Sequence, residues 1–147
     1  MKVSDLLKEK GQNVVTITPN QTVNDALKML LDHKIGSLMV MDTGNQIKGI
    51  ITERDIIRGI AKDFEALKSL KVADLMSTSL IVGTPDDEIE YIMGIMTQNR
   101  IRHLPIVTNQ GLVGMVSIGD LVKSLLQENE VKNRFLEDYI SGNYFGW

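Results

Sequence analysis

The sequence predicts a mixed α+β (α/β) fold built from two similar halves, followed by a helical tail. The main observation is that GIITERD at 49–55 recurs as GMVSIGD at 114–120, with the glycine, the hydroxyl residue and the aspartate in the same places. The apolar residues before each copy also pass from helical spacing to strand-like runs in the same order. At 147 residues the chain is long enough to bury a core.

The duplication extends beyond this motif. VSDLL at 3–7 matches VADLM at 72–76, and Thr18-Pro19 recurs as Thr84-Pro85. The offset between copies is 69 at the leading segments and 66 at the Thr-Pro pairs, and it becomes 65 at the motif because the predicted turn at 42–46 has one residue more than the turn at 108–111. A length change confined to a turn is what a duplicated fold tolerates.

Each half is expected to run strand, helix, strand, strand, helix. The strands are VVTI (14–17), LMVM (38–41) and IKGIIT (47–52) in the first half, and LIVG (80–83), LPIV (104–107) and LVGMVS (112–117) in the second. The first helix of each half has an apolar stripe at i, i+3, i+4, i+7, made by Val23, Ala26, Leu27, Leu30 and by Ile89, Ile92, Met93, Met96. The closing helices contain Ile56, Ile57, Ile60 and Leu121, Val122, Leu125.

These elements define repeat 1 at 1–69, repeat 2 at 70–127 and a tail at 128–147. Because a half of about 60 residues buries little interior alone, we expect the repeats to pack face to face as one module with pseudo-two-fold symmetry. The tail is rich in aromatic residues, and it could fold back on its own module, clasp a second subunit or close over a ligand ring. These aromatic residues are Phe135, Tyr139, Tyr144, Phe145 and Trp147.

Composition excludes several classes of protein. The net charge of -3 argues against a protein built mainly to neutralise nucleic acid. The absence of cysteine excludes disulfides, thiolate metal sites and a cysteine nucleophile, and the two histidines lack the spacing of a metal site. No apolar run approaches the roughly 18 residues of a membrane span, so we expect a cytoplasmic protein without a membrane partner.

The repeated elements resemble a known family. The order strand, helix, strand, strand, helix, with the pattern glycine, two apolar residues, Ser or Thr, two variable residues and Asp at the last junction, is similar to the cystathionine-β-synthase (CBS) domain. Two such domains in tandem form a Bateman module. The resemblance covers residues 3–127, and the HLPIV segment at 103–107 adds to it. It implies binding of adenine nucleotides or other adenosine compounds in clefts between the repeats, and association as a homodimer.

The repeated hydroxyl and aspartate have two interpretations. Thr52 and Asp55, like Ser117 and Asp120, have the spacing of a helix capping box. The same position also suits a ligand, because a helix N-terminus with free N–H groups attracts phosphate and an aspartate beside it can accept hydrogen bonds from a ribose diol. The repeated glycines, at 49 and 114, also have a purely structural interpretation, in which they only relieve crowding in a strand or bulge.

Just before the second strand of each repeat, basic residues occur in repeat 2 but not in repeat 1. In the family, the basic residues at the position of Arg102 and His103 reach the ligand phosphate. The planar guanidinium of Arg102 suits an oxyanion, and His103 could donate a hydrogen bond or add charge when protonated. Alternatively, Arg102 is solvated and His103 is a partly buried imidazole. Repeat 1 has Gly36 and Ser37 at the matching positions, so we expect the two clefts to differ.

The resemblance assigns residues to both clefts. The first, preferred for AMP, combines ribose, phosphate and adenine contacts from Ser117, Asp120, Arg102, His103, Val14, Gly36, Ser37 and Leu38. The second is expected to hold a longer phosphate chain, a different ligand or none, and uses Thr52, Asp55, Arg54, Ile81 and Leu104.

The favoured function is therefore a non-catalytic sensor that binds AMP, ATP or NAD as a ligand, needs no cofactor and signals to a downstream protein. One alternative is a structural dimerisation or nucleic-acid-binding module, although a nucleic-acid partner is not expected. Another is a nucleotide-processing enzyme that uses Asp55 or Asp120 as a base. The sequence shows neither the phosphate loop nor the metal cluster that such chemistry normally needs.

Overall fold

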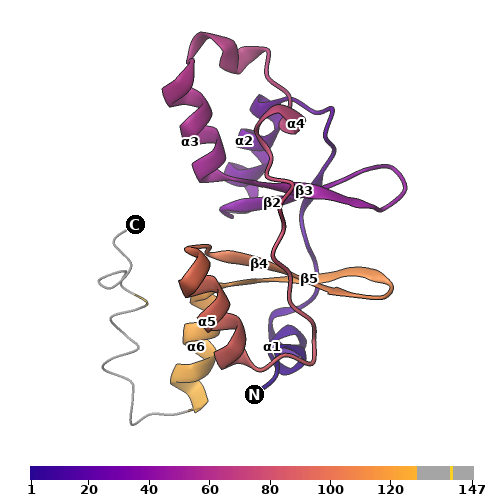
Figure 1. Cartoon of the computed structure of the whole chain (residues 1–147), viewed down its shortest axis with the longest axis vertical. Coiled ribbons are helices and arrows are strands. Elements are labelled where there is room, and N and C mark those ends of the chain that lie inside the picture. Colours follow the sequence, from indigo (N-terminus) through magenta and orange to yellow (C-terminus); the bar gives the residue numbers. More distant parts are fainter. Residues whose placement is uncertain (129–139, 141–147) are drawn as a thin grey trace. The chain divides into compact units, whose positions relative to one another are not determined.

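The structure is a computed structural model, and it describes residues 1–128 and residue 140. The chain divides into two compact units (Figure 1), which we name after their aspartates. The Asp55 unit comprises Asn13–Ile81 and Asn109–Leu112. The Asp120 unit comprises Met1–Gln12, Val82–Thr108 and the chain from Val113 to the end of the last described helix, α6. The aromatic side chains of the predicted tail lie outside the described residues.

A three-stranded sheet forms the centre of the Asp55 unit. Strand β1 (Thr16–Ile17) is parallel to β2 (Ser37–Met41), and β2 is antiparallel to β3 (Ile47–Thr52). In the register of β2 and β3, Ser37 pairs with Thr52. The hydroxyl residue that ends β3 therefore lies beside the start of β2.

Helices cover this sheet and complete its core. They are α2 (Val23–His33), α3 (Glu53–Lys62), the 3₁₀ helix η1 (Glu65–Lys68) and α4 (Val72–Leu75). The predicted stripe of α2 is confirmed, since three of its residues are buried and Leu27 packs partly buried against them. The core consists of Ile17, Val23, Ala26, Leu30, Leu38, Val40, Ile51, Ile56 and Val72.

The Asp120 unit contains α1 (Val3–Lys10), α5 (Ile89–Asn99), β4 (His103–Thr108), β5 (Gly111–Ser117) and α6 (Ile118–Glu128). The strand predicted at 80–83 is reduced to one parallel bridge between Gly83 and Ile106. Two hydrogen bonds of 2.9 Å hold it, from the Gly83 amide to the Pro105 carbonyl and from the Val107 amide to the Gly83 carbonyl. Across the described part of the chain, no helix has the length and apolar character needed to span a membrane.

Helix α1 packs on the second half of the sequence although it belongs to the first. The amide of Val3 donates to the carbonyl of Asp87, and the amide of Ser4 donates to the carbonyl of Pro85, both at 2.9 Å. These bonds satisfy amide groups at the start of the helix that have no partner within it. The helix is thereby anchored to the Asp120 unit by its first turn.

Helix α4 repeats this arrangement in the Asp55 unit. The amide of Val72 donates to the carbonyl of Gln21 at 2.8 Å, and the amide of Ala73 donates to the carbonyl of Pro19 at 3.0 Å. Each recurring Thr-Pro pair therefore supplies the carbonyl that anchors a leading helix. The predicted boundary at residue 69 separates the two sequence repeats. The compact units are divided differently, because α1 of repeat 1 belongs to the Asp120 unit and α4 of repeat 2 belongs to the Asp55 unit.

The repeated glycines allow these leading segments to approach the strands. A Cβ atom added at Gly49 would lie 2.5 Å from the carbonyl oxygen of Ser77, and one added at Gly114 would lie 2.8 Å from Cδ2 of Leu7. Both distances are too short for a carbon atom. At Gly49 the neighbour is a backbone atom, which leaves no room for a side chain, whereas at Gly114 the end of the Leu7 side chain would have to shift. This confirms the interpretation that the glycines relieve crowding.

We predict that Gly49→Ala destabilises the protein by about 1–3 kcal/mol. The added methyl group overlaps the carbonyl oxygen of Ser77, a backbone atom that cannot rotate away as a side chain can. The overlap also disturbs the paired hydrogen bonds between Ile50 and Ser77, which are 3.0 and 2.8 Å long. Urea denaturation monitored by circular dichroism would measure the change.

The matched control is Gly94→Ala. Gly94 lies inside α5, and an added Cβ would meet no atom within 4 Å. This variant should be more stable than the original protein by roughly 0.5–1 kcal/mol, since alanine favours a helix over glycine. Equal stability changes in the two variants would contradict the crowding at Gly49.

Candidate functional site

Each unit has a strand that ends in a hydroxyl residue and continues directly into a helix. In the Asp55 unit the hydroxyl of Thr52 accepts a hydrogen bond from the Asp55 amide at 3.3 Å. The Oδ2 atom of Asp55 accepts hydrogen bonds from the Thr52 amide at 2.9 Å and from the Thr52 hydroxyl at 3.0 Å. The capping box predicted from the spacing is therefore present at the start of α3.

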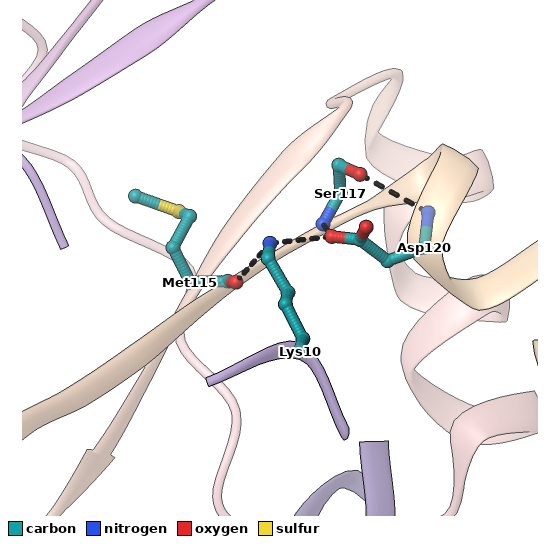
Figure 2. Close-up of polar contacts among 4 residues, drawn as sticks. All are labelled: Lys10, Met115, Ser117 and Asp120. Carbon is teal, nitrogen blue, oxygen red and sulfur yellow. Dashed lines mark hydrogen bonds and ion pairs between the residues drawn. The ribbon is translucent and has the colours of Figure 1, made fainter. Parts of the chain in front are cut away.

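The Asp120 unit has the same arrangement at the start of α6. The hydroxyl of Ser117 accepts a hydrogen bond from the Asp120 amide at 3.1 Å, and Oδ2 of Asp120 accepts one from the Ser117 amide at 2.9 Å (Figure 2). The two motifs thus place an aspartate in the same local geometry in both units.

The backbone groups at these helix starts are less available than the sequence suggested. The Glu53 amide donates to the Gly36 carbonyl at 3.1 Å, and the Ile118 amide donates to the Arg102 carbonyl at 2.9 Å. The third amide of each helix is bonded to the capping hydroxyl. Two of the first three amides of each helix are therefore already bonded within the protein.

The second carboxylate oxygen of each aspartate remains available instead. In the part of the chain that the structure describes, no hydrogen bond reaches Oδ1 of Asp55 or Asp120. An ionised carboxylate oxygen can accept two hydrogen bonds. Each junction therefore presents an acceptor suited to neighbouring hydroxyl groups.

Lys10 also contacts Asp120, and sequence reasoning missed it. Its Nζ atom lies 2.5 Å from Oδ2 of Asp120 and 2.7 Å from the carbonyl oxygen of Met115 (Figure 2). Lys10 is the last residue of α1, 110 positions away in the sequence. The duplicated VSDLL segment indicated a leading helix, but no local spacing connects its end with Asp120.

The electrostatic setting keeps His103 neutral. Burial lowers the pKa of His103 most, and the positive charges of Lys10 and Arg102 lower it further. The negative charge of Asp120 acts in the opposite direction, and the pKa falls from 6.5 to about 4. The expectation that His103 could add positive charge is therefore wrong near pH 7, although a neutral imidazole still donates and accepts hydrogen bonds.

Asp120 is held in its ionised form. Partial burial raises the pKa of this carboxyl group, but the hydrogen bonds from Lys10 and from the Ser117 amide, together with the charge of Lys10, outweigh that effect. The pKa is therefore below its usual value of 3.8. The group is a weak base and a good acceptor.

The other predicted residues fall into both units. Arg54 is exposed on the first turn of α3, whereas Leu38 and Leu104 have no exposed surface. Among the predicted site residues of the Asp55 unit, Ser37 is buried, and Val14, Gly36 and Ile81 are half-buried. The combination of residues from both units in one cleft stays a prediction.

Comparison with known proteins identifies the family. The family model described as CBS domain matches residues 3–62 and 72–127. The two matches follow the sequence repeats, and each ends after one of the two aspartate junctions. The chain belongs to the CBS-domain family, with two copies of the domain in tandem.

Individual relatives agree with this assignment. The chain is 40% identical over 150 residues to the CBS domain-containing protein CBSX3, mitochondrial, of Arabidopsis thaliana, covering 97% of this chain and 73% of that protein. The crystal structure of the CBS-domain protein ATU1752 from Agrobacterium tumefaciens is similar with a TM-score of 0.83 and 36% identity, covering 85% of this chain and 99% of that one.

A third structure, the CBS domain pair of protein MJ0100, was determined in complex with 5′-methylthioadenosine and S-adenosyl-L-methionine. It has a TM-score of 0.76 and 24% identity, and the match covers 88% of this chain and 98% of that one. At this identity the likeness shows the shared fold.

We predict that the ring protons of His103 titrate near pH 4 in NMR spectra of the folded protein. Because the unfolded chain would protonate this histidine below about pH 6.5, the free energy of unfolding should fall as the pH drops from 6.5 to 4. His103→Gln should reduce that fall by roughly 2 kcal/mol.

His33, the second of the two histidines, provides the control. It is exposed at the end of α2, and His33→Gln removes its ring signals, so that the remaining histidine signal is assigned to His103. A titration midpoint of 6.5 or higher for His103 would contradict its burial beside two cations.

Proposed function

We propose that the protein is a non-catalytic regulatory module that binds adenine nucleotides such as AMP, ATP or NAD. The single observation that carries this proposal is the pair of aspartates that keep one carboxylate oxygen available beside a strand-to-helix junction. A ribose offers two neighbouring hydroxyl donors, and an ionised carboxylate is a strong acceptor for them. Membership of the CBS-domain family supports the same interpretation.

The fold supports an adenosine compound as the ligand class. The MJ0100 pair shares this fold and is described with two adenosine compounds. The polar groups around each aspartate then decide which nucleotide binds.

The two junctions favour different ligands. Arg102 directly precedes β4 and His103 begins it, and the guanidinium cation of Arg102 suits a phosphate. In the Asp55 unit the nearest basic residue by sequence is Arg54, exposed on α3. We assign AMP to the Asp120 junction, and a longer phosphate chain or a different ligand to the Asp55 junction.

The chemistry of Asp120 favours recognition over catalysis. A general base works best when its pKa lies near the working pH, whereas the pKa of Asp120 lies below 3.8. One of its two oxygens, Oδ2, also carries two hydrogen bonds already. Release of phosphate from ATP that depends on Asp120 would establish the enzyme instead.

Regulation follows if one conformation of the protein binds the nucleotide better than another, because occupancy then shifts the equilibrium between them. We propose that a homodimer in the cytoplasm transmits this shift to a downstream protein.

We predict that AMP binds to protein freed of endogenous ligand, and that Asp120→Ala lowers its affinity at least about tenfold through loss of a charged acceptor. Isothermal titration calorimetry with AMP, ATP and NAD would measure this. Asp55→Ala tests the second junction in the same way. Failure of every adenosine compound to bind below about 1 mM, a free energy of roughly -4 kcal/mol, would refute the proposed function.

Asp25→Ala is the matched control. Asp25 forms a capping box with Thr22 at the start of α2, with hydrogen bonds of 3.0 and 3.2 Å, but no strand ends there. This variant loses a cap of the same kind and should keep its affinity for AMP. An equal loss of affinity in the Asp25 and Asp120 variants would mean that the aspartates act only through stability.

A further inference from the structure

The fold places Lys10 beside Asp120 by anchoring the whole of α1. Leu6 and Leu7 are buried, and Leu7 occupies the space that the missing side chain of Gly114 leaves open. The helix ends immediately after Lys10, where Gly11 adopts a φ of 92° that favours glycine. Lys10 therefore extends from the last turn of a helix that is fixed against β5.

The ammonium group of Lys10 has one donor left to offer. A lysine carries three N–H donors, and two of them bond to Oδ2 of Asp120 and the carbonyl oxygen of Met115 (Figure 2). No third hydrogen bond to Nζ is found among the residues that the structure describes. The side chain is 36% exposed, so a dissolved molecule can reach it.

The Asp55 unit has no such group at the matching place. VSDLLKEK at 3–10 aligns with VADLMSTS at 72–79, which puts Ser79 where Lys10 stands. Helix α4 also ends at Leu75, whereas α1 continues to Lys10. The lysine therefore distinguishes two junctions whose capping geometry is otherwise the same.

We propose that Lys10 is a specificity-determining residue that makes the Asp120 junction select phosphorylated nucleosides over uncharged ones. The inference rests on the proposed function. Oδ2 of Asp120 holds the ammonium group in place, while Oδ1 stays available for the hydroxyl groups of a sugar. A phosphate on that sugar can accept the third N–H of Lys10 in a charge-assisted hydrogen bond. Adenosine has no anionic group with which to do so.

The test compares AMP with adenosine by isothermal titration calorimetry. The original protein should bind AMP more tightly than adenosine. Lys10→Met should lower the affinity for AMP by about 10- to 100-fold, the loss expected of one hydrogen bond to a charged group. Its affinity for adenosine should stay the same or rise slightly, because Asp120 loses a competing partner.

Two further variants serve as controls. Lys8→Met removes an exposed lysine from the same helix and should change neither affinity. Lys10→Arg keeps the charge and should keep the preference for AMP. Thermal melting establishes that each variant is folded, and Lys10→Gln replaces the methionine variant if that one is not.

The outcomes separate the two proposals. Equal losses for AMP and adenosine in Lys10→Met, or no loss for either, overturn the role of Lys10 and leave the nucleotide-binding function standing. Binding of neither compound to the original protein overturns the role of Lys10, and the proposed function falls as well only if ATP and NAD also fail to bind.

Discussion

The close approach of a leading segment to a strand, possible only where a glycine has no side chain, is the constraint on which the rest of this structure depends. At Gly114 the absent Cβ admits Leu7, and at Gly49 it admits the backbone of Ser77. These contacts fix the helices that precede each domain. They also decide what reaches the end of the neighbouring strand, because α1 ends in Lys10 beside Asp120.

The repeated motif has a structural role, to which we add a proposed role in binding. One oxygen of each aspartate closes a capping box, which stabilises the start of the helix by about 1 kcal/mol. The proposed ligand contact uses the other oxygen. The two interpretations of the motif are therefore compatible, because the hydrogen bonds that stabilise the helix also orient the second oxygen.

Much of the fold could be predicted from the sequence because it depends on local patterns. The spacing of Val23, Ala26 and Leu30 predicted the buried face of α2, and the hydroxyl-to-aspartate spacing predicted both capping boxes. The strand at 80–83 was predicted from its apolar residues, yet it forms only one bridge, since Gly83 makes both of its hydrogen bonds to neighbours of a single residue.

The candidate site was less predictable, because its decisive contacts join distant parts of the chain. Lys10 and Asp120 are 110 residues apart, and neither local spacing nor the repeat connects them. The neutrality of His103 depends on the same neighbour, since burial and two cations together set its pKa. Lys10 reaches both groups because α1 belongs to the Asp120 unit. An alignment of the two halves does not show this placement of α1.

The placement of α1 has a consequence for biosynthesis. Once residues 13–81 have been translated, the Asp55 unit can assemble most of its core. Helix α1 is translated before that unit, but the rest of its own unit, from residue 82 onward, is translated after it. The buried residues Val3, Leu6 and Leu7 therefore lack their partners while the Asp55 unit is made, a period in which a nascent chain is prone to aggregate.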